Sequence, residues 1–176
     1  MAHSIESPRI RLRALSHDDL PILETWENDP EGWLSSNTLN PLSKDFIRQY
    51  ISSSTQHILE TGTMSLIIEL KDSPPTPLGH LVIYDYNPLH CRAGLGVYIA
   101  PEHRRNGYAS EGILLATNYA FDLLRCHQVY AEVLAHNTAS QTMLLALGFH
   151  HTASLPSWQW VQGDYQDLYY YQKWNE

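Results

Sequence analysis

Apolar residues recur along the chain with two different spacings. A period of two residues indicates a strand with one buried face, and a period near 3.6 indicates a helix with one buried side. In the first half of the chain the pattern predicts strands at 10–14, 64–70 and 80–86 and helices at 19–28 and 44–61. The connection 71–79 contains three prolines and ends on a glycine, which predicts a long hairpin loop inside one domain.

The second half of the chain alternates strands and helices more regularly. The pattern predicts strands at 94–100 and 128–134, helices at 108–124 and 137–147, and last strands from residue 149 and at 166–174. Gly148 follows the second of these helices, where a left-handed cap belongs. The β-α-β-α-β order and the length of 176 residues predict one α/β (α+β) domain over 1–176, built around a mixed sheet.

Composition narrows the classes of partner. The chain has 19 acidic and 11 basic residues, a formal charge of -8, and no basic run suited to a phosphate backbone, so we expect no nucleic acid partner. If this acidity bears on function, it favours a cationic small molecule or peptide. No apolar stretch approaches the roughly 20 residues that span a bilayer, and the N-terminus lacks the order of a signal peptide. We therefore expect a cytoplasmic protein without a membrane partner.

Cysteines and histidines are present but predict neither a crosslink nor a metal site. Cys91 and Cys126 form no CxxC motif and no disulfide framework, which fits a reducing compartment. His150 and His151 are adjacent, and adjacent side chains on a strand point to opposite faces. We therefore expect no bound metal.

The stretch 101–110 (PEHRRNGYAS) joins a predicted strand to a predicted helix. A helix N-terminus leaves backbone N–H groups unpaired and carries partial positive charge, which suits an anion. Gly107 lets the backbone approach a ligand, and Arg104 and Arg105 add positive charge. These features predict a phosphate or pyrophosphate site, although the same residues also suit a plain turn with solvated arginines. The GxxxxGKS/T and GxGxxG nucleotide motifs are absent.

Two motifs in this half of the chain resemble those of a known family. Arg104-Arg-Asn-Gly107-Tyr-Ala109, preceded by the strand end Ile99-Ala-Pro101, is similar to the motif R/Q-x-x-G-x-G/A. Asn137-Thr-Ala-Ser140, followed by Leu147-Gly-Phe149, is similar to the motif N-x-x-S…x-G-F. Both motifs are typical of the GCN5-related N-acetyltransferases, the GNAT superfamily. The segments RLRALSHDDL, NDPEGW and QGDYQDLYYYQ resemble the branch that contains ribosomal-protein N-terminal acetyltransferases and spermidine N-acetyltransferases.

The resemblance implies a fold and a cofactor site. The fold is a mostly antiparallel sheet of about seven strands flanked by helices, with a V-shaped opening for acetyl-CoA between strands 94–100 and 128–134. A backbone N–H in this opening would bind the thioester carbonyl and stabilise the oxyanion. Asn137 would bind the pantetheine and also suits a helix N-cap. The implied cofactor-binding residues are Val97, Tyr98 and Ile99 for the pantetheine arm, Arg104, Arg105, Asn106, Gly107, Tyr108 and Ala109 for the pyrophosphate, and Asn137 and Ser140 nearby.

The chain departs from the family at two catalytic positions. Leu144 stands where many members carry the tyrosine that protonates the CoA thiolate, and Gly94 where relatives carry a glutamate that binds or deprotonates the amine. A base is still required, because only a neutral amine attacks the thioester. The remaining candidates are Asp85 and His90 as catalytic groups, and Glu27, Asp29, Glu31 and Asp85 for binding the amine; each also suits a solvated surface position.

The resemblance implies direct transfer of an acetyl group from acetyl-CoA to a primary amine. The acidic composition and the GDYQD segment favour a polyamine or diamine such as spermidine, whereas the missing tyrosine and glutamate favour a protein N-terminus. A non-catalytic acetyl-CoA-binding sensor is the alternative from a different class. The aromatic C-terminal segment, with Trp158, Trp160 and the tyrosines at 169–171, suits either the core or the surface of a homodimer.

Overall fold

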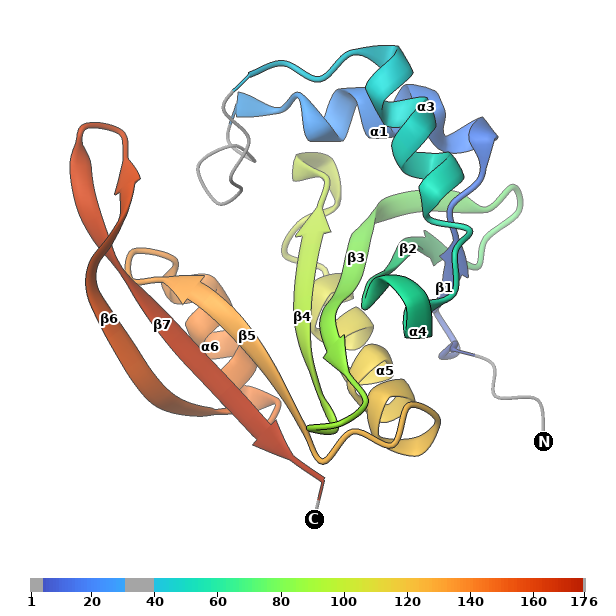
Figure 1. The fold of residues 1–176 in the computed structure, drawn as a ribbon. Coiled ribbons are helices and arrows are strands. Elements are labelled where there is room, and N and C mark those ends of the chain that lie inside the picture. Colours follow the sequence, from blue (N-terminus) through green and yellow to red (C-terminus); the bar gives the residue numbers. More distant parts are fainter. Residues whose placement is uncertain (1–4, 31–39, 176) are drawn as a thin grey trace.

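A seven-stranded sheet forms the centre of the protein in our computed structural model, which describes residues 5–30 and 40–175. The strands run in the order β1-β2-β3-β4-β5-β7-β6 (Figure 1). Neighbouring strands are antiparallel except for the central pair β4 and β5, which is parallel. The predicted mixed, mostly antiparallel sheet is therefore confirmed. The strands are β1 (Ile10–Ala14), β2 (Met64–Leu70), β3 (Thr76–Asn87), β4 (Arg92–Ile99), β5 (Gln128–Leu134), β6 (His150–Val161) and β7 (Asp164–Trp174).

Helices cover both faces of the sheet. α5 connects the parallel strands β4 and β5, as a crossover between parallel neighbours requires. Among the described residues, no helix is both long and apolar enough to cross a membrane. The described helices are α1 (Leu20–Glu27), α3 (Lys44–Ser53), α4 (Ile58–Thr61), α5 (Tyr108–Asp122) and α6 (Thr138–Ala146), with short 3₁₀ turns at His17–Asp19 and Pro101–His103.

The helix predicted at 44–61 is interrupted in the structure. α3 ends at Ser53, and α4 begins only at Ile58. The hydroxyls of Ser53, Ser54 and Thr55 donate hydrogen bonds of 2.6 to 2.8 Å to carbonyls three residues earlier. These side chains offer the carbonyls an alternative to the helical N–H donors, so a run of hydroxyl residues ends the helix.

The loop predicted at 71–79 is shorter than expected. β3 already begins at Thr76, so Pro77 lies inside a central strand. Proline has no N–H for a sheet, and the register between β2 and β3 shifts at this point, between Ile68 and Glu69. The irregularity allows the strand to continue through a residue that normally ends one.

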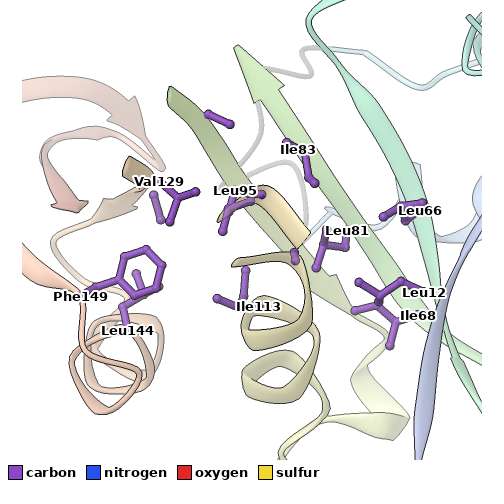
Figure 2. Packing of buried hydrophobic residues seen from close by; sticks show 14 of the residues in the cluster. Leu12, Leu66, Ile68, Leu81, Ile83, Leu95, Ile113, Val129, Leu144 and Phe149 are labelled. Atoms are coloured by element: carbon purple, nitrogen blue, oxygen red, sulfur yellow. The ribbon is translucent and has the colours of Figure 1, made fainter. Parts of the chain in front are cut away.

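Alternate residues of β2 face two separate hydrophobic clusters. Leu66 and Ile68 lie in the main cluster, together with residues of α5, whereas Ile67 lies in a second cluster with residues of α1 and α3. Figure 2 shows Ile113 of α5 below Leu95, with Leu81 to one side, in the main cluster. The central strands are therefore buried on both faces, which holds them in place around the site described below.

An ionic cluster joins β1, β2 and the turn before α1. Arg13 donates two hydrogen bonds of 2.8 Å to the Asp19 carboxylate and one of 2.8 Å to Glu69. The two acids expose only 5% and 7% of their side chains. Burial, the largest single effect, would raise the pKa of both carboxyls. The hydrogen bonds and charge of Arg13, together with the Ser16 N–H at Asp19 and Arg11 at Glu69, lower the pKa of each instead. Both acids therefore stay charged and depend on the arginine.

We expect Arg13→Ala to lower the free energy of unfolding by about 3 kcal/mol, because it removes the cation that two buried carboxylates share. Arg48→Ala is the matched control, since Arg48 pairs with Asp45 in an exposed contact whose loss costs about 0.5 kcal/mol or less. Urea unfolding followed by circular dichroism measures both variants. Small and equal losses would contradict the structural role of the cluster.

Candidate active site

The central parallel strands pair over a short distance and then separate. In the described structure β4 and β5 pair only at Arg92, Ala93 and Gly94, opposite 128–130. Beyond Gly94 the two strands diverge (Figure 1). A cleft of about 320 Å³ lies between them, lined by 95–98 on β4 and by 131–134 on β5. The predicted V-shaped opening is therefore confirmed.

The predicted pyrophosphate turn follows the end of β4 at which the V is open. Arg105 and Gly107 have positive φ angles of 64° and 80°, and Gly107 is the N-cap of α5. A left-handed N-cap favours glycine and lets the chain enter the helix abruptly. Asn106, Tyr108 and Ala109 complete the turn and the first helical residues. The first-turn N–H groups of an α-helix have no intrahelical partner, so this end of α5 suits an anion.

The turn is held by an arginine that the sequence analysis did not identify. Arg9, just before β1, donates from Nε to Glu111 of α5 at 2.8 Å and from Nη1 to the carbonyl of Asn106 at 3.2 Å. Its guanidinium also lies 5.1 Å from the centre of the Tyr108 ring. These contacts come from a segment about a hundred residues away in the chain. Nothing local in the sequence indicates them.

Arg104 packs back against β4. Its Nε donates to the carbonyl of Ile99 at 3.0 Å, and its guanidinium lies 5.8 Å from the centre of the Tyr98 ring. Tyr98 in turn donates its hydroxyl proton to Asp29 at 3.2 Å. Burial and the neighbouring Asp29 carboxylate raise the pKa of Tyr98 to about 12, so the phenol stays neutral. One predicted cofactor residue is thus linked directly to a predicted substrate residue.

The second predicted cofactor motif lies across the cleft. Asn137 caps α6, and its side-chain oxygen accepts the backbone N–H of Ser140 at 3.1 Å. Both residues line the cleft, as do Val97 and Tyr98 from the opposite side. The structure therefore brings Asn137 and Ser140 to the wall of the cleft that faces Val97 and Tyr98, about forty residues earlier in the sequence.

A second, larger cavity adjoins the cleft. It measures about 840 Å³ and is lined by residues of α1, the segment 40–43, α3 and β3. His80 and Val82 line both cavities, so the two meet on this face of β3. Glu27, a predicted substrate residue, is part of the lining. Glu31 lies outside the described residues.

His80 is the residue of this junction that sequence reasoning missed. It is buried, and burial lowers the pKa of its imidazole to about 4. Nδ1 lies 3.7 Å from the Glu27 carboxylate, and Nε2 lies 3.4 Å from the Tyr50 hydroxyl, which is 2.7 Å from Ser65. Burial also raises the pKa of Glu27. The sequence signal for His80 is its position as a polar residue at the start of the apolar run at 80–86.

Asp85 and His90 lie near the end of the V where β4 and β5 are paired. Asp85 accepts a hydrogen bond of 2.8 Å from Tyr130 and lies 3.8 Å from Arg92. His90 lies in the turn between β3 and β4, where its N–H donates to Asn87. Neither residue lines the two cavities described above. Their catalytic roles, and substrate binding by Asp85, remain predictions without support from this geometry.

The structure explains both departures from the family pattern. A Cβ atom at Gly94 would lie 2.4 Å from ring atoms of Tyr84, so this tyrosine already fills the space that a larger residue would need. Leu144 is 2% exposed and lies in the main core, where Figure 2 shows it beside Phe149. Neither position supplies an acid or a base, and any such group must come from elsewhere.

The family-model comparison agrees with this geometry. Residues 9–150 match the family described as "Acetyltransferase (GNAT) domain". The chain belongs to this family of acetyltransferases.

The similar proteins include spermidine acetyltransferases. The spermidine N(1)-acetyltransferase of Vibrio cholerae is 26% identical over 166 residues, covering 91% of this chain and 90% of that protein. An uncharacterized N-acetyltransferase of Bacillus subtilis, YoaA, is 38% identical over 82 residues, covering 47% of this chain and 46% of that protein. The crystal structure of the Vibrio cholerae spermidine N-acetyltransferase in complex with CoA and spermine has a TM-score of 0.83 and 25% identity, covering 96% of each chain.

We expect Gly107→Val to abolish measurable acetyl-CoA binding, because a branched side chain disfavours the left-handed backbone and obstructs the approach of a pyrophosphate to the N–H groups. Gly163→Val is the matched control. Gly163 has a similar φ of 93° in the β6–β7 turn, with no atom within 4 Å of an added Cβ. Isothermal titration calorimetry compares the two variants. Equal affinities would show that the pyrophosphate assignment is wrong.

Proposed function

We propose that the protein transfers the acetyl group of acetyl-CoA directly to a primary amine, and that the amine is a polyamine such as spermidine. The observation that carries the proposal is the junction of two cavities at His80 and Val82. One is the cleft expected to hold the thioester, and the other is large enough for a separate acceptor. Two reactants held side by side in this way need no covalent enzyme intermediate.

The proposed acetyl-CoA site rests on two features: the part of β4 that is not paired with β5, and the turn before α5. β4 continues from Gly94 to Ile99 without pairing to β5, so its cleft-facing groups are available to the pantetheine arm and the thioester carbonyl. The pyrophosphate would lie on the N–H groups of 104–109, next to the open end of β4. Asn137 and Ser140 would close the opposite wall.

The acceptor side suits a flexible chain of methylene groups with cationic ends. Leu42, Phe46 and Ile47 line the second cavity with apolar surface, and Glu27 places a carboxylate beside them. Methylene groups pack on such surface, while an ammonium group pairs with the acid. The net charge of -8 would also attract a polycation. The Vibrio cholerae relative named above is a spermidine N(1)-acetyltransferase, and its structure was solved with CoA and spermine.

The test is the release of free thiol from acetyl-CoA with a panel of amines: spermidine, spermine, short diamines and peptides with free N-termini. We expect turnover with the polyamines and none with the peptides. Turnover with peptides alone would instead identify an N-terminal acetyltransferase. No turnover with any amine, together with clear binding of acetyl-CoA by calorimetry, would identify a sensor.

We also propose a homodimer, formed through the hairpin of β6 and β7 at the end of the sheet. Trp158, Trp160 and Tyr165 of this hairpin are 60%, 63% and 58% exposed. Large apolar side chains gathered at the surface are typical of an interface. Sedimentation analysis should give twice the chain mass of 20.2 kDa. A single-chain mass at every concentration would overturn this assignment.

A further inference from the structure

His80 is a buried titratable side chain at the one place where the cleft and the acceptor cavity meet. Its strand is fixed closely against β4, because Gly79 allows the Tyr98 carbonyl to approach; a Cβ atom there would lie 2.1 Å from that oxygen. His80 is directly opposite Tyr98 in the register of the two strands. Residues directly opposite each other point to the same face, so the imidazole lies on the face of the sheet that also carries Tyr98 and Val82.

The reaction needs a proton acceptor. At position 94, where relatives carry a glutamate, this chain has no acid. Gly94 carries no side chain, and Tyr84 occupies the space around it. We propose that His80 is the general base that deprotonates the acceptor amine, with Glu27 stabilising the imidazolium that forms. This inference rests on the proposed function and assigns a catalytic residue to it.

The protons and bonds of this step balance without a further reactant. The bound ammonium gives one proton to Nε2 of His80, and the neutral amine forms a C–N bond to the thioester carbonyl. The tetrahedral intermediate then breaks its C–S bond. The thiolate takes the second proton of the attacking nitrogen, directly or through water, which leaves the amide and free CoA. The imidazolium releases its proton to solvent through the carboxylate of Glu27, which is 32% exposed.

The charges around the ring support this role. Burial lowers the pKa of His80 to about 4, which keeps the imidazole neutral at pH 7 but also makes it a weak base, so proton transfer to it depends on the Glu27 carboxylate 3.7 Å from Nδ1. The ionisable groups that face it are Glu27 from α1 and Tyr50 from α3, with Tyr98 beside it on β4. Burial raises the pKa of Tyr50, so that phenol also stays neutral. When His80 takes up a proton, the Glu27 carboxylate is therefore the negative charge that faces the imidazolium.

Tyr50 is a positioning residue in this scheme. Its hydroxyl lies between Nε2 of His80 and Oγ of Ser65, at 3.4 and 2.7 Å. The Tyr50 ring also meets the imidazole edge-on, with ring centres 6.2 Å apart. In this scheme the Tyr50 hydroxyl donates its proton to Oγ of Ser65, which leaves the lone pair of Nε2 to the amine, and the edge-on ring contact keeps the imidazole at one angle.

The experiment compares wild type, His80→Gln and the surface control His17→Gln in thiol release with spermidine. We expect His80→Gln to lower kcat by about 100-fold, with an unchanged affinity for acetyl-CoA by calorimetry and an unchanged melting temperature. The deficit should shrink as the pH rises from about 7 to about 9.5, because more of the amine is then neutral without a base. His17→Gln should match wild type at every pH, since His17 is exposed in a turn and lines neither cavity.

Tyr50→Phe provides a second route if His80→Gln unfolds. It retains the ring and removes the hydroxyl, and we expect kcat to fall by about fivefold, with the same recovery at high pH. If wild type turns over spermidine and neither variant shows a deficit that shrinks with pH, His80 is not the base. If wild type acetylates no amine, the proposed function fails and this assignment fails with it.

Discussion

Three residue pairs join β4 to β5, and the protein's ligand-binding geometry depends on the point at which that pairing ends. Backbone N–H and C=O groups need partners, and two strands that separate in the middle of a sheet leave a row of them facing a cleft. A ligand with an amide-bearing arm is a natural partner for such a row. A cofactor in this cleft and an acceptor in the adjoining cavity would reach the same residues, His80 and Val82.

The separation persists because each side of the V is packed independently. β4 is paired along its length with β3 and covered by α5, whereas β5 is paired throughout with β7, and Leu144 of α6 packs in the core behind it. Neither strand gains by closing onto the other, since its own hydrophobic face is already buried. At the open end, Arg9 holds the turn before α5 through Glu111 and Asn106, which keeps the first N–H groups of that helix in place.

The chain retains the family's backbone chemistry while its side-chain chemistry differs. Tyr84 packs so closely on Gly94 that a glutamate at position 94 would collide with its ring, and Leu144 is part of the core. Oriented backbone donors and proximity account for much of the catalysis of acyl transfer. The fold can therefore support the reaction without the family's glutamate and tyrosine. The proton acceptor is then free to come from another strand, and β3 presents a histidine to both cavities.

The sequence alone determined the order of the elements, the turn before α5 with its glycine N-cap, and the cap at Asn137, because these depend on backbone rules that act within a few residues. It failed where side chains competed for backbone groups, as at Ser53 and Ser54, which end α3 early. Only the tertiary structure decided which side chains share the cleft. Glu27, Tyr50 and His80 belong to three elements, and what brings them together is the packing of α1 and α3 on the face of β3, a long-range contact that no local pattern encodes.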